Sequence, residues 1–185
     1  IDPRTVGLPP VDELSIPYIC SKECFIHEQV WTESATIDNL VVINVTPQHF
    51  ETDSSTSPNR SCVTPAGYIA GLFRYWRGTM IFRFQIVCSG MHRGKLRVVY
   101  EPSAGSTGDD FNQVYSRIID IETERDFEIP VQWHAREAFL QTQDLNYGST
   151  EFNKGNSPNT NPRFHNGKLT VQVINPLTSP DPDLG

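Results

Sequence analysis

The sequence predicts an all-β protein, an antiparallel sandwich or jelly roll with one short helix. Three observations favour this fold. Short apolar runs alternate with polar residues at the period of a strand, loops rich in Gly and Pro separate them, and only one segment has helical spacing. About seven strands in one chain, with several long loops, are typical of that architecture.

The N-terminal quarter predicts an arm, two strands and a loop. Residues 1–17 hold four prolines and little periodicity, so we expect an extended N-terminal arm, followed by one domain over residues 18–185. Residues 18–31 suit a strand with an irregular middle, and residues 40–45 are apolar on both faces, as expected deep in a sandwich. The polar stretch 48–60 predicts a surface loop.

One amphipathic helix is expected after that loop. Thr64 followed by Pro65 is typical of an N-cap and a first helical position. Apolar residues then recur at i, i+3, i+4 and i+7, namely Ile69, Leu72, Phe73 and Trp76.

The rest of the sandwich is organised around residues 73–102. A strand over 79–88 puts Met80, Phe82 and Phe84 on one face, and a glycine-bracketed turn leads to a second strand over 95–100 that Pro102 ends. Further strands are expected at 117–122, 127–133 and 168–175. Pro130 predicts an edge or a break in pairing, and residues 143–166 predict another surface loop.

Composition and charge exclude several classes of protein. A chain of 185 residues buries roughly 70% of its unfolded surface, so it needs no metal or disulfide to hold a core. A formal charge of −7 argues against a domain whose main function is to bind the phosphate backbone of nucleic acids. No apolar run reaches the ~18 residues of a membrane span. The five histidines are dispersed, so we expect no metal, and no Walker or Rossmann glycine pattern occurs, so we expect no cofactor. The four cysteines are expected to be buried free thiols.

Several separated motifs occur in the order found in one family. They are Phe73-Arg74-Tyr75-Trp76-Arg77-Gly78, Met91-His92-Arg93-Gly94-Lys95-Leu96, Tyr100-Glu101-Pro102, Ser116-Arg117-Ile118-Ile119-Asp120-Ile121 and Asn175-Pro176-Leu177-Thr178-Ser179-Pro180. In these five motifs the chain resembles the capsid proteins of the picornavirus order, most of all those of the marnavirus, dicistrovirus and iflavirus branches.

The resemblance implies a structural function rather than catalysis. It implies an eight-stranded jelly roll, lettered B to I, in a virion assembled in the host cytoplasm. The expected partners are two other major capsid proteins, symmetry copies of the chain, a small internal capsid protein and RNA held without sequence-specific binding. Together the three major proteins would form a pseudo-T=3 icosahedral shell. The host receptor is not indicated.

The lettering leaves one strand without residues. Counting in order gives B at 24–31, C at 40–45, D at 79–88, E at 95–100, F at 117–122, G at 127–133 and H at 169–175. Strand I, which the family places between B and D, has none. The chain also lacks an initiator Met and a signal peptide. We therefore expect a product of a longer precursor whose polypeptide continues beyond Gly185, because unpaired backbone groups on B and D would favour aggregation.

One acidic triplet, Asp109-Asp110-Phe111, is a candidate chemical site in the loop after strand E. As turn formers, the two acids would be solvated and Phe111 would anchor the loop. The triplet is also similar to an Asp-Asp-Phe motif of insect picorna-like capsids, implicated there in the maturation cleavage of a capsid precursor. Two adjacent carboxylates could share a proton, so that one activates water while the other assists the leaving group.

A different functional class stays open from the sequence alone. A cellular jelly-roll binding module, such as a lectin-like domain, would use the same long loops to hold a small ligand. It would behave as a monomer or small oligomer, whereas a capsid protein would form a shell.

Overall fold

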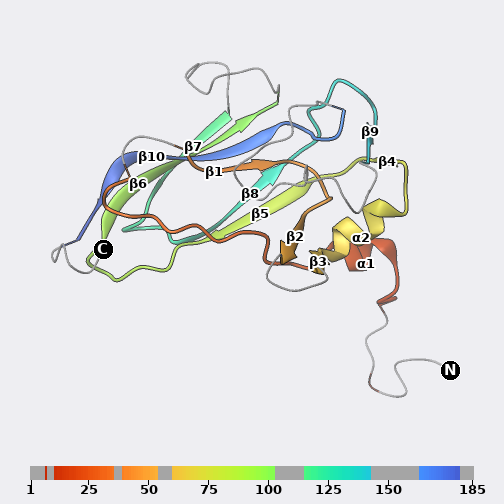
Figure 1. The fold of residues 1–185 in the computed structure, drawn as a ribbon, viewed down its shortest axis with the longest axis horizontal. Coiled ribbons are helices and arrows are strands. Elements are labelled where there is room, and N and C mark those ends of the chain that lie inside the picture. The colour runs from red at the N-terminus through yellow and green to blue at the C-terminus, as the bar shows by residue number, and fades with distance from the viewer. Residues whose placement is uncertain are drawn as a thin grey trace.

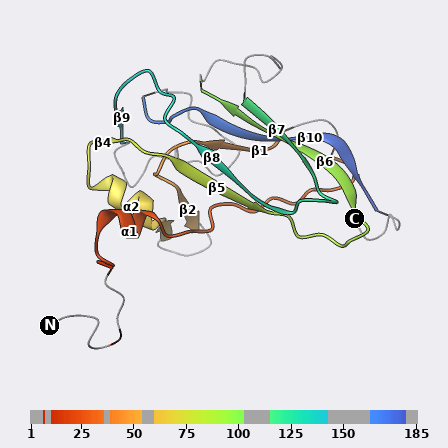
Figure 2. The same cartoon turned by 180° about the vertical axis from the view of Figure 1, so that it is seen from behind.

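A computed structural model describes residue 7 and the ranges 11–35, 39–53, 60–102, 115–142 and 163–179. The described chain forms two layers of strands with a cluster of small elements at one end (Figure 1). The same layering is seen from behind in Figure 2.

The first layer is a four-stranded antiparallel sheet. It contains β1 (Asn39–Asn44), β10 (Lys168–Thr178), β6 (Arg93–Glu101) and β7 (Tyr115–Asp120), in the order β1-β10-β6-β7. β10 lies inside the sheet and pairs with β1 on one side and β6 on the other, Val171 facing both Val41 and Val98. The strands lettered C, H, E and F therefore make one sheet.

The second layer is the antiparallel pair of β5 (Met80–Gln85) and β8 (Asp126–Val131), which match the strands lettered D and G. Phe84 stacks on its cross-strand partner Phe127, with ring centroids 5.3 Å apart. The core lies between the layers and includes the fully buried residues Leu169 and Ile119. Leu169, Val171 and Val173 point inward as predicted, and burying such side chains contributes about 1.5–3 kcal/mol each.

Four smaller units complete the described fold. At the end shown on the right of Figure 1 lie the helices α1 (Ile16–Cys20) and α2 (Pro65–Gly71), which contact each other, and two antiparallel ribbons. The ribbons are β2 (Phe50–Asp53) with β3 (Arg60–Val63), and β4 (Tyr75–Trp76) with β9 (Leu140–Gln141).

The strand predicted over residues 18–31 is wrong, because these residues form no strand. Residues 18–20 belong to α1, which also takes the last two residues of the expected arm, and residues 22–31 are irregular. Pro17 near the start of α1 favours a helix there. Residues 22–31 pair with no strand among the described residues, so strand B is not formed as a ladder.

The predicted helix is confirmed at its start and wrong at its end. Thr64 accepts a hydrogen bond from the Gly67 amide at 3.0 Å, as an N-cap does. α2 nevertheless ends at Gly71, and Trp76 lies in β4, where its ring packs edge-on against Trp133 at 5.2 Å. The helical spacing was misleading because Leu72 and Phe73 are exposed, at 65% and 47%.

Two predicted surface loops contain ordered backbone. The stretch 48–60 includes β2 and the start of β3, and the stretch 143–166 ends in His165 and Asn166, which are 4% and 1% exposed. The thiols of Cys20, Cys24 and Cys88 are free as predicted, but Cys20 is exposed and none of the three is buried. The edge predicted from Pro130 is confirmed, because β8 pairs only with β5 in the described chain.

The turn into β10 depends on Asn166 and Gly167. The Asn166 amide donates to the Val45 carbonyl at 2.8 Å, and Val45 donates back to the Gly167 carbonyl at 3.0 Å. Gly167 has φ +80°, and a Cβ there would lie 2.3 Å from the Glu101 carbonyl oxygen. Only glycine suits this position, because it needs both a left-handed backbone and a close approach.

We expect Gly167→Ala to lower the free energy of unfolding by about 2–4 kcal/mol, because it combines backbone strain with a clash against backbone. Gly78→Ala is the matched control, since a Cβ at Gly78 meets no atom within 4 Å. Urea unfolding followed by tryptophan fluorescence measures both variants. Equal stability of the two variants would contradict the role assigned to Gly167.

Candidate functional site and family

The predicted acidic site lies outside the described residues. Asp109, Asp110 and Phe111 belong to the connection between β6 and β7, whose described ends are Pro102 and Tyr115. The expectation that the triplet follows strand E is confirmed by this order of elements. Tyr100 and Tyr115, the last cross-strand pair before that connection, mark where it leaves the sheet.

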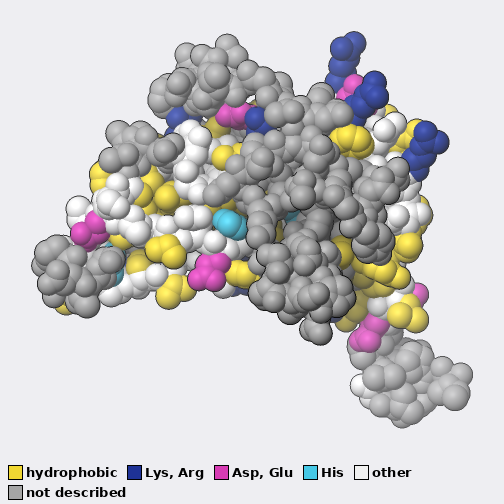
Figure 3. Space-filling view, viewed as in Figure 1, with side chains coloured by type: hydrophobic (Ala, Val, Ile, Leu, Met, Phe, Trp, Pro, Cys, Tyr) yellow, Lys and Arg dark blue, Asp and Glu magenta, His cyan; other side chains and the backbone are white. Residues whose placement is uncertain are grey.

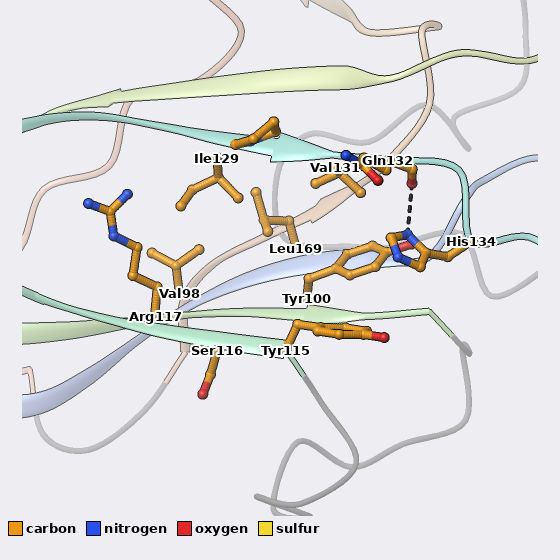
Figure 4. A pocket seen from close by; sticks show the side chains of 11 residues that line it. Val98, Tyr100, Tyr115, Ser116, Arg117, Ile129, Val131, Gln132, His134 and Leu169 are labelled. Carbon is orange, nitrogen blue, oxygen red and sulfur yellow. Dashed lines mark hydrogen bonds between the residues drawn. The ribbon is translucent and has the colours of Figure 1, made fainter.

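A cavity of about 270 Å³ opens next to that pair (Figure 4). Its apolar wall comes from both layers, with Val98 and Leu169 from the sheet and Ile129 and Val131 from β8. Arg117 lies at one end of the cavity and His134 at the other (Figure 4). The cavity therefore lies between the facing strands β7 and β8 of the two layers.

Three rings meet at the His134 end. Tyr100 lies 6.2 Å from Tyr115 and 5.3 Å from His134, measured between ring centroids. The Tyr100 hydroxyl donates to the Asn166 carbonyl at 2.9 Å, and burial raises the pKa of Tyr100 to about 12. Tyr100 is therefore a neutral hydrogen-bond donor at physiological pH, not an acid or base.

Asn166 joins these rings to β8. Its side-chain amide donates to the Gln132 carbonyl at 2.8 Å, and its side-chain oxygen accepts from the His134 amide at 3.1 Å. The sequence reasoning missed this residue because it lies in a polar stretch. The dipeptide Asn166-Gly167 was the available signal, since Asn-Gly marks a tight turn.

A second notable feature is the edge of β5 away from β8. No described strand pairs with this edge, although residues 22–31 run beside it in Figures 1 and 2. Arg83 of β5 binds Asp126 of β8 at 2.5 Å and reaches Glu23 of the irregular segment at 3.1 Å. Hydrogen bonds from Arg83 lower the pKa of Asp126 to about 2, so this pair stays ionised at physiological pH.

Residues 27–33, in and just after the irregular segment, carry unpaired polar atoms. His27 Nε2, Trp31 Nε1 and Glu33 Oε1 are buried without a hydrogen-bond partner in the described structure. Buried polar groups in proteins are normally paired with protein groups or with water.

The described residues hold no candidate metal centre. No group of three or more His, Cys, Asp or Glu side chains there could hold a metal ion. Neither described helix has the length and apolar character that crossing a membrane requires.

Comparisons with known proteins identify relatives among viral shells. The chain is 36% identical to a solved chain of a marine algae virus of the order Picornavirales, with a TM-score of 0.86, covering 98% of this chain and 71% of that one. It also matches a chain of the Israel acute paralysis virus pentamer at 24% identity and a TM-score of 0.75, covering 98% and 70%. That second likeness concerns the fold alone. No family model matches the chain.

A curated relative agrees with the structural matches. The structural polyprotein of cricket paralysis virus is 26% identical over 136 residues, which is 70% of this chain and 15% of the polyprotein. The chain thus spans a small part of that polyprotein. Since this chain is 36% identical to the algae virus chain over 98% of its own length, the protein belongs to the jelly-roll capsid proteins of the picornavirus order, structural components of the virion.

Proposed function

We propose that this chain is one of three major capsid proteins that build a pseudo-T=3 icosahedral shell around an RNA genome. Two sister subunits and symmetry copies of the chain are its lateral partners. The observation that carries this proposal is the 36% identity to a Picornavirales virus chain over 98% of this chain. The similar solved chains come from whole virus particles and from a pentamer, which supports assembly of this chain with other subunits.

Exposed apolar side chains support a subunit of a larger assembly. Phe25, Val30, Leu72, Val87 and Phe139 are 60–99% exposed, which is costly for a monomer in water. Obligate interfaces bury about 2,000 Å² or more and are rich in apolar residues. Assembly would remove these side chains from water.

RNA contact is proposed to be weak and independent of sequence. The chain carries 22 acidic residues against 15 Lys and Arg, so it repels phosphate overall. Enclosure by the shell, rather than tight binding by this subunit, would retain the genome. A small internal capsid protein is the remaining proposed partner.

The open side of β5 is proposed to receive one more strand. Residues 22–31 run beside β5, and Arg83 spans from β8 to Glu23 across this side. A strand inserted there would satisfy the free amides and carbonyls of β5, and it corresponds to the strand lettered I. We propose that polypeptide beyond Gly185 supplies it. This would complete an eight-stranded jelly roll.

Isolation of native particles tests the proposed shell. We expect sedimentation and electron microscopy to place the chain in closed particles, in equal amounts with two other proteins. A chain that instead behaves as a monomer or small oligomer and binds a glycan would favour the lectin-like alternative. The measurement needs no variant.

Asp109-Asp110-Phe111 is proposed to take part in cleavage of a capsid precursor, with the carboxylates sharing a proton as general acid and base. Changing Asp109→Asn and Asp110→Asn together should then leave the precursor uncut in assembled particles, because neither amide can activate water. Gel analysis of particle proteins over time measures this. Normal cleavage in the double variant would show that the two acids act only as turn residues.

A further inference from the structure

The ribbon of β4 and β9 has a buried and an exposed face. Trp76 and Leu140 are cross-strand partners and are 8% and 3% exposed. Their neighbours Tyr75 and Phe139 are 49% and 60% exposed. Tyr75 pairs with Gln141, and Arg77 and Phe139 lie just outside the ladder, Arg77 directly after Trp76 and Phe139 directly before Leu140. We call Tyr75, Arg77 and Phe139 the outer ribbon face.

Arginines on and around this face lack the acidic partners found elsewhere. Arg83, Arg93, Lys95 and Arg117 on the sandwich each form an ion pair. By contrast, no described carboxylate pairs with three exposed arginines of this end, namely Arg74, Arg77 and Arg136. Figure 3 shows Lys and Arg side chains gathered over the end that carries β4 and β9.

One contact positions the Arg77 side chain, and another positions the backbone turn that carries Arg136. The Arg77 guanidinium lies over the Trp133 ring, 5.8 Å from its centroid. The Trp133 indole donates to the Glu137 carbonyl at 3.0 Å, which closes the turn that carries Arg136. The positive charges are therefore partly ordered before any partner binds, which lowers the entropic cost of binding.

Exposed apolar side chains also occur on α2 and directly after it, just before β4 in the chain. Tyr68 of α2 and Leu72, which directly follows it, are 63% and 65% exposed. Exposed aromatic rings beside arginines are the composition found at the centres of protein interfaces. The positive charge of the arginines indicates that the partner carries carboxylates, since guanidinium groups pair best with carboxylates.

We propose that the outer ribbon face, together with Arg136, binds a segment of a sister capsid subunit that carries carboxylates beside an apolar side chain. The carboxylates pair with Arg77 and Arg136, and the apolar side chain packs between Tyr75 and Phe139. This inference rests on the proposed shell. It specifies the location of one lateral contact between subunits and the chemical groups that make it.

RNA fits this surface less well than protein. Single-stranded RNA also uses arginines and aromatic rings, but it needs a positive groove along its backbone. Here the flanking surface of Tyr68 and Leu72 is apolar, and the chain is acidic overall. These features favour a peptide segment, which supplies apolar and acidic groups together.

A charge-reversal variant tests the contact in the co-expressed set of capsid proteins. Arg77→Glu with Arg136→Glu should reduce the yield of particles about tenfold or more, because close charge pairs at interfaces couple strongly. The matched control is Arg93→Glu with Lys95→Glu, which reverses two exposed cationic side chains of the sandwich. The control should assemble within about twofold of wild type, since exposed ion pairs contribute little.

Cross-linking identifies the partner directly. Arg77→Lys and Arg136→Lys keep the charge and supply amines, which a carbodiimide joins to carboxylates in contact. We expect cross-links to Asp or Glu of a sister subunit in empty and filled particles alike. Cross-links only to a second copy of this chain, or assembly equal to wild type in the charge-reversal variant, would overturn the proposal. Protection of the two arginines from phenylglyoxal that appears only in RNA-filled particles would also overturn it, in favour of RNA.

Failure of this contact and failure of the shell can be told apart. Closed particles that form with the charge-reversal variant contradict only the contact. If the wild-type proteins form a soluble complex that needs Arg77 and Arg136 but never closes into particles, the contact stands and the shell proposal fails. Loss of assembly in both variants would attribute the effect to net charge and contradict the contact.

Discussion

Backbone pairing along β10 is the constraint on which the described fold depends. This strand is the longest, spanning Lys168–Thr178, and it exchanges hydrogen bonds with β1 on one side and β6 on the other. Its start is fixed by Gly167 and by the hydrogen bonds of Asn166 to Val45, Gln132 and Tyr100. Because β10 comes late in the chain, the four-stranded sheet closes only when distant segments meet.

The second layer lacks an equivalent central strand. β5 has β8 on one side, no described strand pairs with its other side, and Arg83 of β5 binds Glu23 of the irregular segment. An edge of this kind pairs readily with another strand. The two layers therefore differ in how fully their strands are paired. Residues 22–31 run along the open side of β5.

Strands with strict alternation could be predicted from the sequence, and segments whose structure depends on distant partners could not. Phe82 and Phe84, or Leu169 and Val171, reveal the buried face of a strand by themselves. Asn166 looked like a loop residue because its burial depends on Tyr100 and Val45, which are far away in sequence. The helix after Thr64 was extended too far because Trp76 is buried through Trp133, not through helical packing. The acidic triplet was placed after the correct strand, and its chemistry stays a prediction.

We propose that an additional strand completes this capsid subunit on the open side of β5. A cryo-electron microscopy map of the native particle, at a resolution that separates strands, measures this most directly. The account predicts one extended strand between β5 and residues 22–31, bonded to the free backbone groups of β5. A map in which residues 22–31 themselves pair with β5, or in which that edge faces solvent, would contradict it.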